Sequence, residues 1–167
     1  MFVSLGTHPQ PFTRLLNEVA RLVDQKKLKG NVLVQAGYTS FSHPYMKIVD
    51  FLSLEEFEQA LKSCQLFITH AGEGNLGQAL QWGKPTVTVP RLKEFGEHTD
   101  NHQLELADAM GAEYGIFSVD KIENLENGIA LALMQKVSGK YAGYIPRILE
   151  NEARVKGLTS KLNLPKI

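Results

Sequence analysis

The chain has 167 residues, of which 43% are hydrophobic and 22% are charged, and its formal net charge at pH 7 is zero. These values are typical of one globular domain with its own core, and they exclude nucleic acid as a partner because the scattered lysines and arginines form no basic surface. No window approaches the about 20 apolar residues of a membrane-spanning helix and no signal peptide is recognisable, so we expect a cytoplasmic chain.

Short apolar runs alternate with longer segments of helical period along the chain. The expected strands, in chain order, span 2–5, 32–35, 47–50, 66–69, 86–89 and 115–118. The expected helices span about 11–26, 53–64, 75–82, 101–110 and about 120–136. This alternation predicts an α/β fold with a Rossmann-like parallel sheet of about six strands and helices on both faces.

Several of these helices carry start or stop signals. The first is predicted by apolar residues that recur on one face between Leu15 and Val23. Ser53 and Glu56 have the spacing of a capping box at the start of the second. Gly83 and Pro85 end the third, as a glycine followed closely by a proline commonly does.

The segment from Phe67 to Asn75 runs from an apolar strand through a glycine turn into a helix start. Gly72 and Gly74 lack a Cβ, so the backbone there can turn tightly and approach a ligand closely. The first amides of the following helix have no partner inside the helix, and such amides bind phosphate. An ordinary strand-to-helix turn is the alternative interpretation, because it also needs a glycine.

Polar residues and glycines follow the other predicted strands as well. Gly6, Thr7 and His8 follow the first strand, and Arg91 lies just after the fifth. Ligands of open parallel sheets bind outside the carboxyl ends of the strands, so these positions are candidates for a site. The loop 91–100 is rich in charge, and we expect Lys93, Glu94 and Glu97 in it to be solvated.

Four ordered motifs carry a family resemblance. They are VSLGTH at 3–8, ITHAGEG at 68–74, GKPTVTVPR at 83–91 and GEHTDNHQLE at 96–105. Together they resemble the family 28 glycosyltransferase C-terminal domain over about residues 1–120. More narrowly, the chain is similar to the donor-binding subunits of two-component bacterial exopolysaccharide glycosyltransferases, and to the soluble subunit of the dolichol-linked chitobiose-forming transferase.

The resemblance implies one half of a GT-B glycosyltransferase, the half that holds a UDP-sugar. In the family the nucleobase meets the end of the third strand, the diphosphate lies over the first and fourth loops, and the start of the helix after the fifth strand contacts the sugar or phosphates. The donor-binding residues implied are Gly6, Thr7, Phe51, Leu52, His70, Ala71, Gly72, Gly74, Asn75, Gln78, Arg91, Asn101, His102 and Gln103. Gln78 stands where the family usually has a glutamate that holds the ribose, and a neutral amide binds a diol more weakly than a carboxylate does.

The reaction implied is inverting transfer of a hexosyl group, with no metal and no cofactor besides the UDP-sugar substrate. His8 is the candidate base because an unperturbed histidine titrates near neutrality, although the base can also come from a partner. A loop histidine that only lines the site is the favoured interpretation of His8. For His70, contact with phosphate or orientation of the turn is the favoured role. An accessory subunit that binds the nucleotide sugar without catalysis is the alternative function. A UDP-sugar epimerase is disfavoured, because its two domains need a longer chain.

The resemblance also implies a membrane-anchored, acceptor-binding partner subunit. The acceptor implied is a polyprenyl-diphosphate-linked saccharide, at the inner face of the plasma membrane, in cell-surface polysaccharide synthesis. We expect residues 1–140 to form the nucleotide-sugar-binding domain and residues 141–167 to form an amphipathic C-terminal helix. Such a helix packs on its own sheet in most proteins, and docking onto the partner is the second interpretation.

Overall fold

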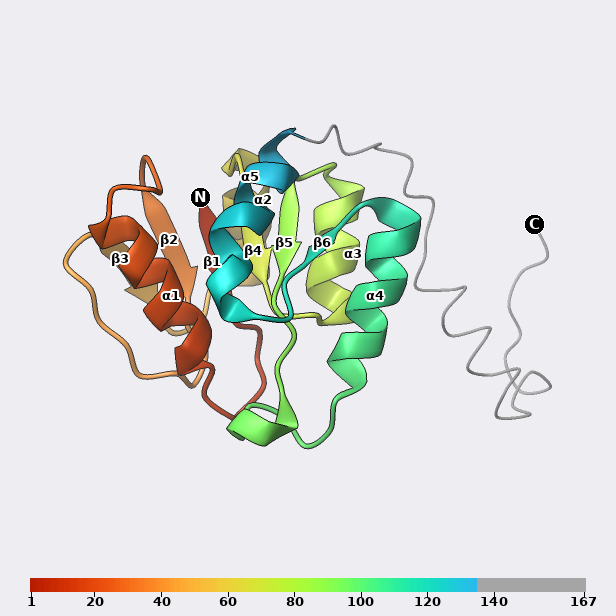
Figure 1. The fold of residues 1–167 in the computed structure, drawn as a ribbon. Helices are drawn as coiled ribbons and strands as arrows, with labels where there is room; N and C mark the ends of the chain where they lie inside the picture. Colours follow the sequence, from red (N-terminus) through yellow and green to blue (C-terminus); the bar gives the residue numbers. More distant parts are fainter. Residues whose placement is uncertain (135–167) are drawn as a thin grey trace, which may run out of the picture.

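The computed structural model describes residues 1–134, which form an α/β domain around one parallel sheet (Figure 1). The strands are β1 (Phe2–Ser4), β2 (Val32–Gln35), β3 (Met46–Val49), β4 (Phe67–Thr69), β5 (Thr86–Thr88) and β6 (Phe117–Ser118). They lie in the order β3-β2-β1-β4-β5-β6, and every neighbouring pair is parallel. The predicted fold class and the predicted six-stranded sheet are confirmed.

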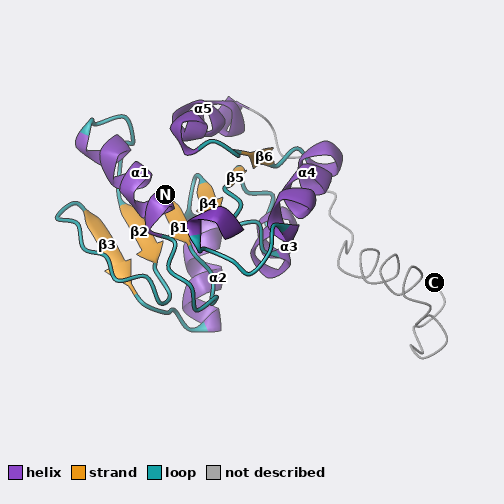
Figure 2. Ribbon diagram, turned by 60° about the horizontal axis from the view of Figure 1, so that its bottom comes forward, coloured by secondary structure: helices purple, strands orange, loops and turns teal. Residues whose placement is uncertain are grey.

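Helices cover both faces of this sheet (Figure 2). The α-helices in the described part are α1 (Thr13–Asp24), α2 (Leu54–Ser63), α3 (Glu73–Gln81), α4 (His102–Tyr114) and α5 (Leu125–Met134), with short 3₁₀ helices η1 (Lys93–Phe95) and η2 (Ile122–Asn124). Helices α1 and α5 lie on one face and α2 and α3 on the other, while α4 lies beside α3. Each layer therefore buries one side of the strands.

The central strand β1 shows why these residues form strands. Phe2 pairs with Leu33 and Phe67 in the parallel register, and its ring packs on the rings of Phe57 and Phe67 at 5.0 and 5.2 Å between centroids. Val3, the next residue, faces the opposite core beneath α1 and α5. A strand covered on both faces is a continuous apolar run, which is the pattern that the sequence shows.

The helix boundaries refine the predictions. The capping box at Ser53 is present, with Ser53 accepting from the Glu56 amide. Helix α3 begins at Glu73, two residues before the predicted start, and α4 continues past Gly111 to Tyr114. Helix α5 begins at Leu125, later than predicted, because a 3₁₀ turn precedes it.

The strand order reverses at β1, which lies between β2 and β4. The connections from β1 and β4 leave toward opposite faces of the sheet, so a crevice opens at their carboxyl ends. Within residues 1–134, no helix is both long and apolar enough to cross a membrane. The predicted C-terminal helix in 141–167 lies outside the described residues.

Candidate functional site

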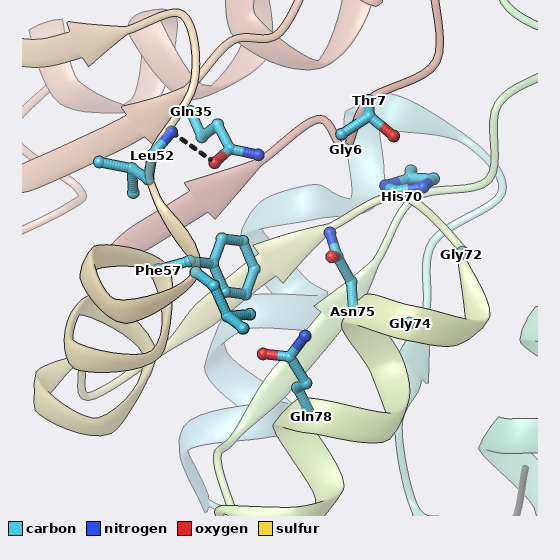
Figure 3. Close-up of a pocket in the computed structure, with 11 residues that line it drawn as sticks. Gly6, Thr7, Gln35, Leu52, Phe57, His70, Gly72, Gly74, Asn75 and Gln78 are labelled. Carbon is cyan, nitrogen blue, oxygen red and sulfur yellow. Dashed lines mark hydrogen bonds between the residues drawn. The ribbon is translucent and has the colours of Figure 1, made fainter.

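A cavity of about 410 Å³ lies at the crevice beside the carboxyl ends of β1, β2, β3 and β4 (Figure 3). Its lining residues are Gly6, Thr7, Gln35, Leu52, Leu54, Phe57, His70, Gly72, Gly74, Asn75 and Gln78. They come from the loops after β1, β3 and β4, from the last residue of β2, and from the facing ends of α2 and α3. The structure thus brings together predicted residues from the first, third and fourth loops and from α3.

The start of α3 forms one wall of the cavity. Gly72 is the N-cap residue, and no side chain caps the helix. Leu76 is the first residue whose amide donates to the N-cap carbonyl, at 3.0 Å, so the preceding amides of the first turn have no acceptor within the helix. Unpaired amides and the positive end of a helix dipole attract an anion, and here they border a cavity.

The His70 ring forms the wall between the first and fourth loops. A Cβ added at Gly6 would lie 2.3 Å from Cε1 of His70, and one added at Gly72 would lie 2.3 Å from its Nε2. Glycine is therefore required at both positions by the ring, and Gly6 also has a φ of +72°. A Cβ at Gly74 would meet nothing within 4 Å. Unlike Gly6 and Gly72, Gly74 therefore has free space at the position of a Cβ.

His70 is uncharged at physiological pH. Burial, and after it the nearby Arg91 charge, lower the pKa of His70 from its usual 6.5 to about 3. Its Nδ1 lies 3.4 Å from Oγ1 of Thr69. The ring can therefore act as a neutral hydrogen-bonding group, but a pKa this low makes it a poor proton acceptor in catalysis.

This pKa predicts an acid-labile fold. Below pH 6.5 the unfolded chain binds a proton at His70 that the folded chain does not bind, so the free energy of unfolding falls as the pH drops toward 3. At pH 5 the loss should be about 2 kcal/mol, on a scale of about 1.4 kcal/mol per pH unit. Urea unfolding of the wild type and of His70→Phe at pH 7.5 and pH 5 measures it. Equal losses in the two proteins would contradict the prediction.

A buried polar network supports the floor of the cavity. Nδ2 of Asn75 donates to Oγ of Ser4 at 3.1 Å and to Oγ1 of Thr69 at 2.8 Å. Oγ1 of Thr69 in turn donates to the Ser4 carbonyl at 2.9 Å. This network fixes Asn75 on α3 to the ends of β1 and β4. The first turn of α3 is therefore held in place before any ligand binds.

Gln35, Leu54 and Phe57 line the cavity although the sequence analysis did not select them. Oε1 of Gln35 accepts from the Leu52 amide at 3.1 Å, so that amide already has a partner. The available signal was a polar residue at the end of the otherwise apolar strand β2. Leu54 and Phe57 belong to the first turns of α2, and only the tertiary arrangement places them at the site.

Other predicted site residues do not line this cavity. Phe51 is half exposed, and its ring packs edge-on against Tyr38 at 5.2 Å between centroids. Ala71 is buried in the apolar cluster under α3 and α4. Asn101 and His102 are exposed at the start of α4.

Three more predicted residues do not line the cavity: His8 and Arg91 lie in loops, and Gln103 lies on α4. The ring of His8 stacks on His98 at 4.5 Å, and burial, His98 and Arg91 all lower the pKa of His8. Gln103 is buried, and its Oε1 accepts from the Arg91 amide at 3.0 Å. Arg91 itself is 1% exposed and does not line the cavity.

The charged loop 91–100 differs from the expectation. Glu97 is 3% exposed rather than solvated, because both of its carboxylate oxygens accept from Arg14 at 2.9 and 2.8 Å. Lys93 and Glu94 are exposed, as expected. The loop is therefore attached to α1 by a buried ion pair. Across residues 1–134, no three histidine, cysteine or acidic side chains are grouped in a way that would hold a metal ion.

The sequence matches the model of the glycosyltransferase family 28 C-terminal domain over residues 1–142. The chain belongs to this family. A search of curated proteins finds no match. Family membership makes the cavity, with its uncapped helix start, the candidate site of a glycosyltransferase domain.

Solved structures show the same fold. The chain is similar to a kitacinnamycin glycotransferase, with 17% identity and a TM-score of 0.59 over 95% of this chain and 37% of that chain. It is similar to MurG of Acinetobacter baumannii, with 18% identity and a TM-score of 0.54 over 81% of this chain and 41% of that chain. It is also similar to the spinosyn forosaminyltransferase SpnP, with 16% identity and a TM-score of 0.59 over 96% of this chain and 44% of that chain. The family 28 domain thus matches one half of GT-B glycosyltransferases and spans about two-fifths of these chains.

Proposed function

We propose that this family 28 domain binds a UDP-sugar in the cavity and provides the donor half of an inverting glycosyltransferase. The observation that carries the proposal is the uncapped start of α3 at the wall of a cavity at the switch point of the sheet. The first turn of α3 and the loop at Gly6 and Thr7 would hold the diphosphate. Gln78, one turn further along α3, is placed for the ribose.

The nucleobase subsite of this proposal is the end of β3. Leu52 lines the cavity there, and its carbonyl would accept from the base, because its amide already donates to Gln35. Phe51 is exposed beside it and would pack near the base. Asn101 and His102 lie exposed at the start of α4. They would contact the sugar of a donor that extends from the cavity toward the start of this helix.

The acceptor half would be another chain. The family 28 domain spans about two-fifths of the GT-B structures to which it is similar, and the proposal assigns the remainder to a membrane-anchored partner. The acceptor would be a polyprenyl-diphosphate-linked saccharide at the inner face of the plasma membrane, as in a two-component exopolysaccharide transferase. Residues 141–167 would assist docking.

The catalytic base of this proposal lies in the partner or at His8. His70 has too low a pKa to serve, and His8 also has a lowered pKa and lies beside the cavity rather than in it. The developing charge on the leaving diphosphate would be stabilised by the amides of α3. An accessory role without catalysis remains the second candidate, because Gln78 replaces the family's glutamate at the cavity.

Calorimetric titration with UDP tests the donor site. We expect the purified chain to bind UDP in the presence of EDTA, and to bind GDP much more weakly. Gln78→Ala should weaken UDP binding by about tenfold, the effect of losing about 1.4 kcal/mol of hydrogen bonding. Gln81→Ala is the matched control, because Gln81 is exposed on the same helix and does not line the cavity. Equal affinities for UDP and GDP would contradict the proposal.

A further inference from the structure

Arg91 is the largest fully buried side chain in the described domain, although it follows a strand end in a polar loop. Its Nη1 donates to the carbonyls of Gln10 and Glu97 at 2.7 and 3.1 Å, and its Nη2 donates to the Leu5 carbonyl at 2.8 Å. The Phe12 ring lies 4.8 Å from Cζ. All of these partners are neutral groups, so none of them balances the guanidinium charge.

The Glu97 carboxylate raises the pKa of Arg91 through its charge, but it is already paired with a different arginine. Glu97 accepts from Nε and Nη2 of Arg14 and from the Leu92 amide, which closes a neutral ion pair. Asp100, further along the loop, is an exposed carboxylate that bonds to the His98 ring. The buried Arg91 and the partly buried Arg14 therefore have one buried carboxylate between them, and of the two only Arg14 is hydrogen-bonded to it. Among the described residues, Nε of Arg91 and Nη1 of Arg14 are buried without any hydrogen-bond partner.

Arg91 remains charged in this environment. Burial lowers the pKa of Arg91 from 12.5 to about 10, so it still carries a proton at neutral pH. Burying an uncompensated charge destabilises a fold, and an apolar residue in the same space would not. Such a charge is understandable when a ligand of opposite charge binds nearby.

The position of Arg91 fits that explanation. The Leu5 carbonyl that it contacts directly precedes Gly6 and Thr7, which line the cavity. The charge also lowers the pKa of His70, whose ring lies against Gly6 and lines the same cavity. Arg91 therefore lies behind the first loop and within electrostatic range of the fourth, where the proposed function places the diphosphate.

We propose that Arg91 is a positioning residue that attracts the diphosphate of the donor by its buried charge, through the first loop and without touching the ligand. This inference rests on the proposed function. The positive charge that complements the diphosphate would then belong to a residue that lies outside the cavity. A buried charge acts through a medium of low dielectric constant, so its effect on a bound anion persists over a longer distance than that of a surface charge.

The test compares UDP with uridine, which has the same base and ribose but no phosphate. We expect Arg91→Gln to weaken UDP binding on the order of tenfold while uridine binding changes less than about twofold. Arg91→Lys should restore most of the UDP affinity, because it keeps the charge. Arg21→Gln is the control that removes one exposed positive charge, which is paired with Glu18 on α1. Thermal melting shows which variants fold. If Arg91→Gln does not fold, Arg91→Met is the second variant without the charge.

A second experiment uses only the wild-type protein and varies the salt concentration. In the wild type, the ratio of UDP affinity to uridine affinity should fall less than about threefold between about 50 and 500 mM NaCl, because salt screens a buried charge weakly. A loss of that preference at high salt would overturn the proposal. So would an equal loss of UDP and uridine binding in Arg91→Gln, or a folded Arg91→Lys that fails to recover UDP binding. A wild-type chain that binds neither ligand would overturn the proposed function as well, whereas normal UDP binding by Arg91→Gln would overturn only the role of Arg91.

Discussion

Replacing Glu97 with alanine should lower the free energy of unfolding by about 3 kcal/mol or more. Glu97 is buried, and its carboxylate accepts two bonds from Arg14 and one from the Leu92 amide. Its removal leaves Arg14, whose side chain is 15% exposed, as a second uncompensated charge near Arg91. The loop after β5 would also lose its ion pair with α1 and keep the hydrogen bond from Arg14 to the Pro90 carbonyl.

Urea unfolding at pH 7.5 measures this effect, with Glu94→Ala as the matched control. Glu94 lies in the same loop but is exposed, so its replacement should change the free energy of unfolding by less than about 0.5 kcal/mol. The double variant Arg14→Leu/Glu97→Leu should be more stable than Glu97→Ala, because it removes the charge as well as its partner. Similar small costs for Glu97→Ala and Glu94→Ala would show that the ion pair contributes little.

Gly72→Ala should destabilise the domain by about 1–3 kcal/mol, the usual cost of overpacking. The φ of Gly72 is −103°, which alanine adopts without strain, so the expected cost comes from the contact of its Cβ with the His70 ring. Gly74→Ala is the opposite case. Its Cβ meets no atom within 4 Å and it lies inside α3, so alanine should stabilise the helix by up to about 1 kcal/mol.

The two variants test the packing directly, since the same substitution two residues apart should have opposite signs. Thermal and urea unfolding give both values. In a His70→Ala background, Gly72→Ala should lose most of its cost, because the ring is gone. A cost that stays unchanged in that background would show that the ring is not the reason for the glycine.

The sequence predicted the sheet well because each strand is an apolar run between turn residues, a signal that depends on local order alone. The end of α4 was predicted less well. The helix was predicted to end at residue 110, but Gly111 lies inside it, where a Cβ would approach the Ile116 carbonyl to 3.0 Å. Gly115, with a φ of +71°, ends the helix instead. Which of two glycines ends a helix depends on packing that the sequence does not display.

Of the candidate site, the sequence indicated only the features that depend on local order. The glycine turn and the residues after β1 and β3 follow from the rule that ligands bind at strand ends, and the cavity lies beside them. The prediction that Glu97 is solvated was wrong, because its partner Arg14 lies 83 positions away in the sequence. Gln35 was missed because nothing local indicates that the end of β2 reaches the Leu52 amide.

The position of β1 at the centre of the sheet has a consequence for how the domain forms. β1 is synthesised before the two strands that pair with it. Phe2 needs both Leu33 and Phe67 as partners, and parallel strands cannot pair through a tight hairpin. The bond from Arg91 to the Leu5 carbonyl spans 86 positions. On the ribosome the first loop can therefore gain its bond from Arg91 only after the chain has emerged past β5. We expect refolding to be slow, limited by long-range loop closure rather than by helix formation.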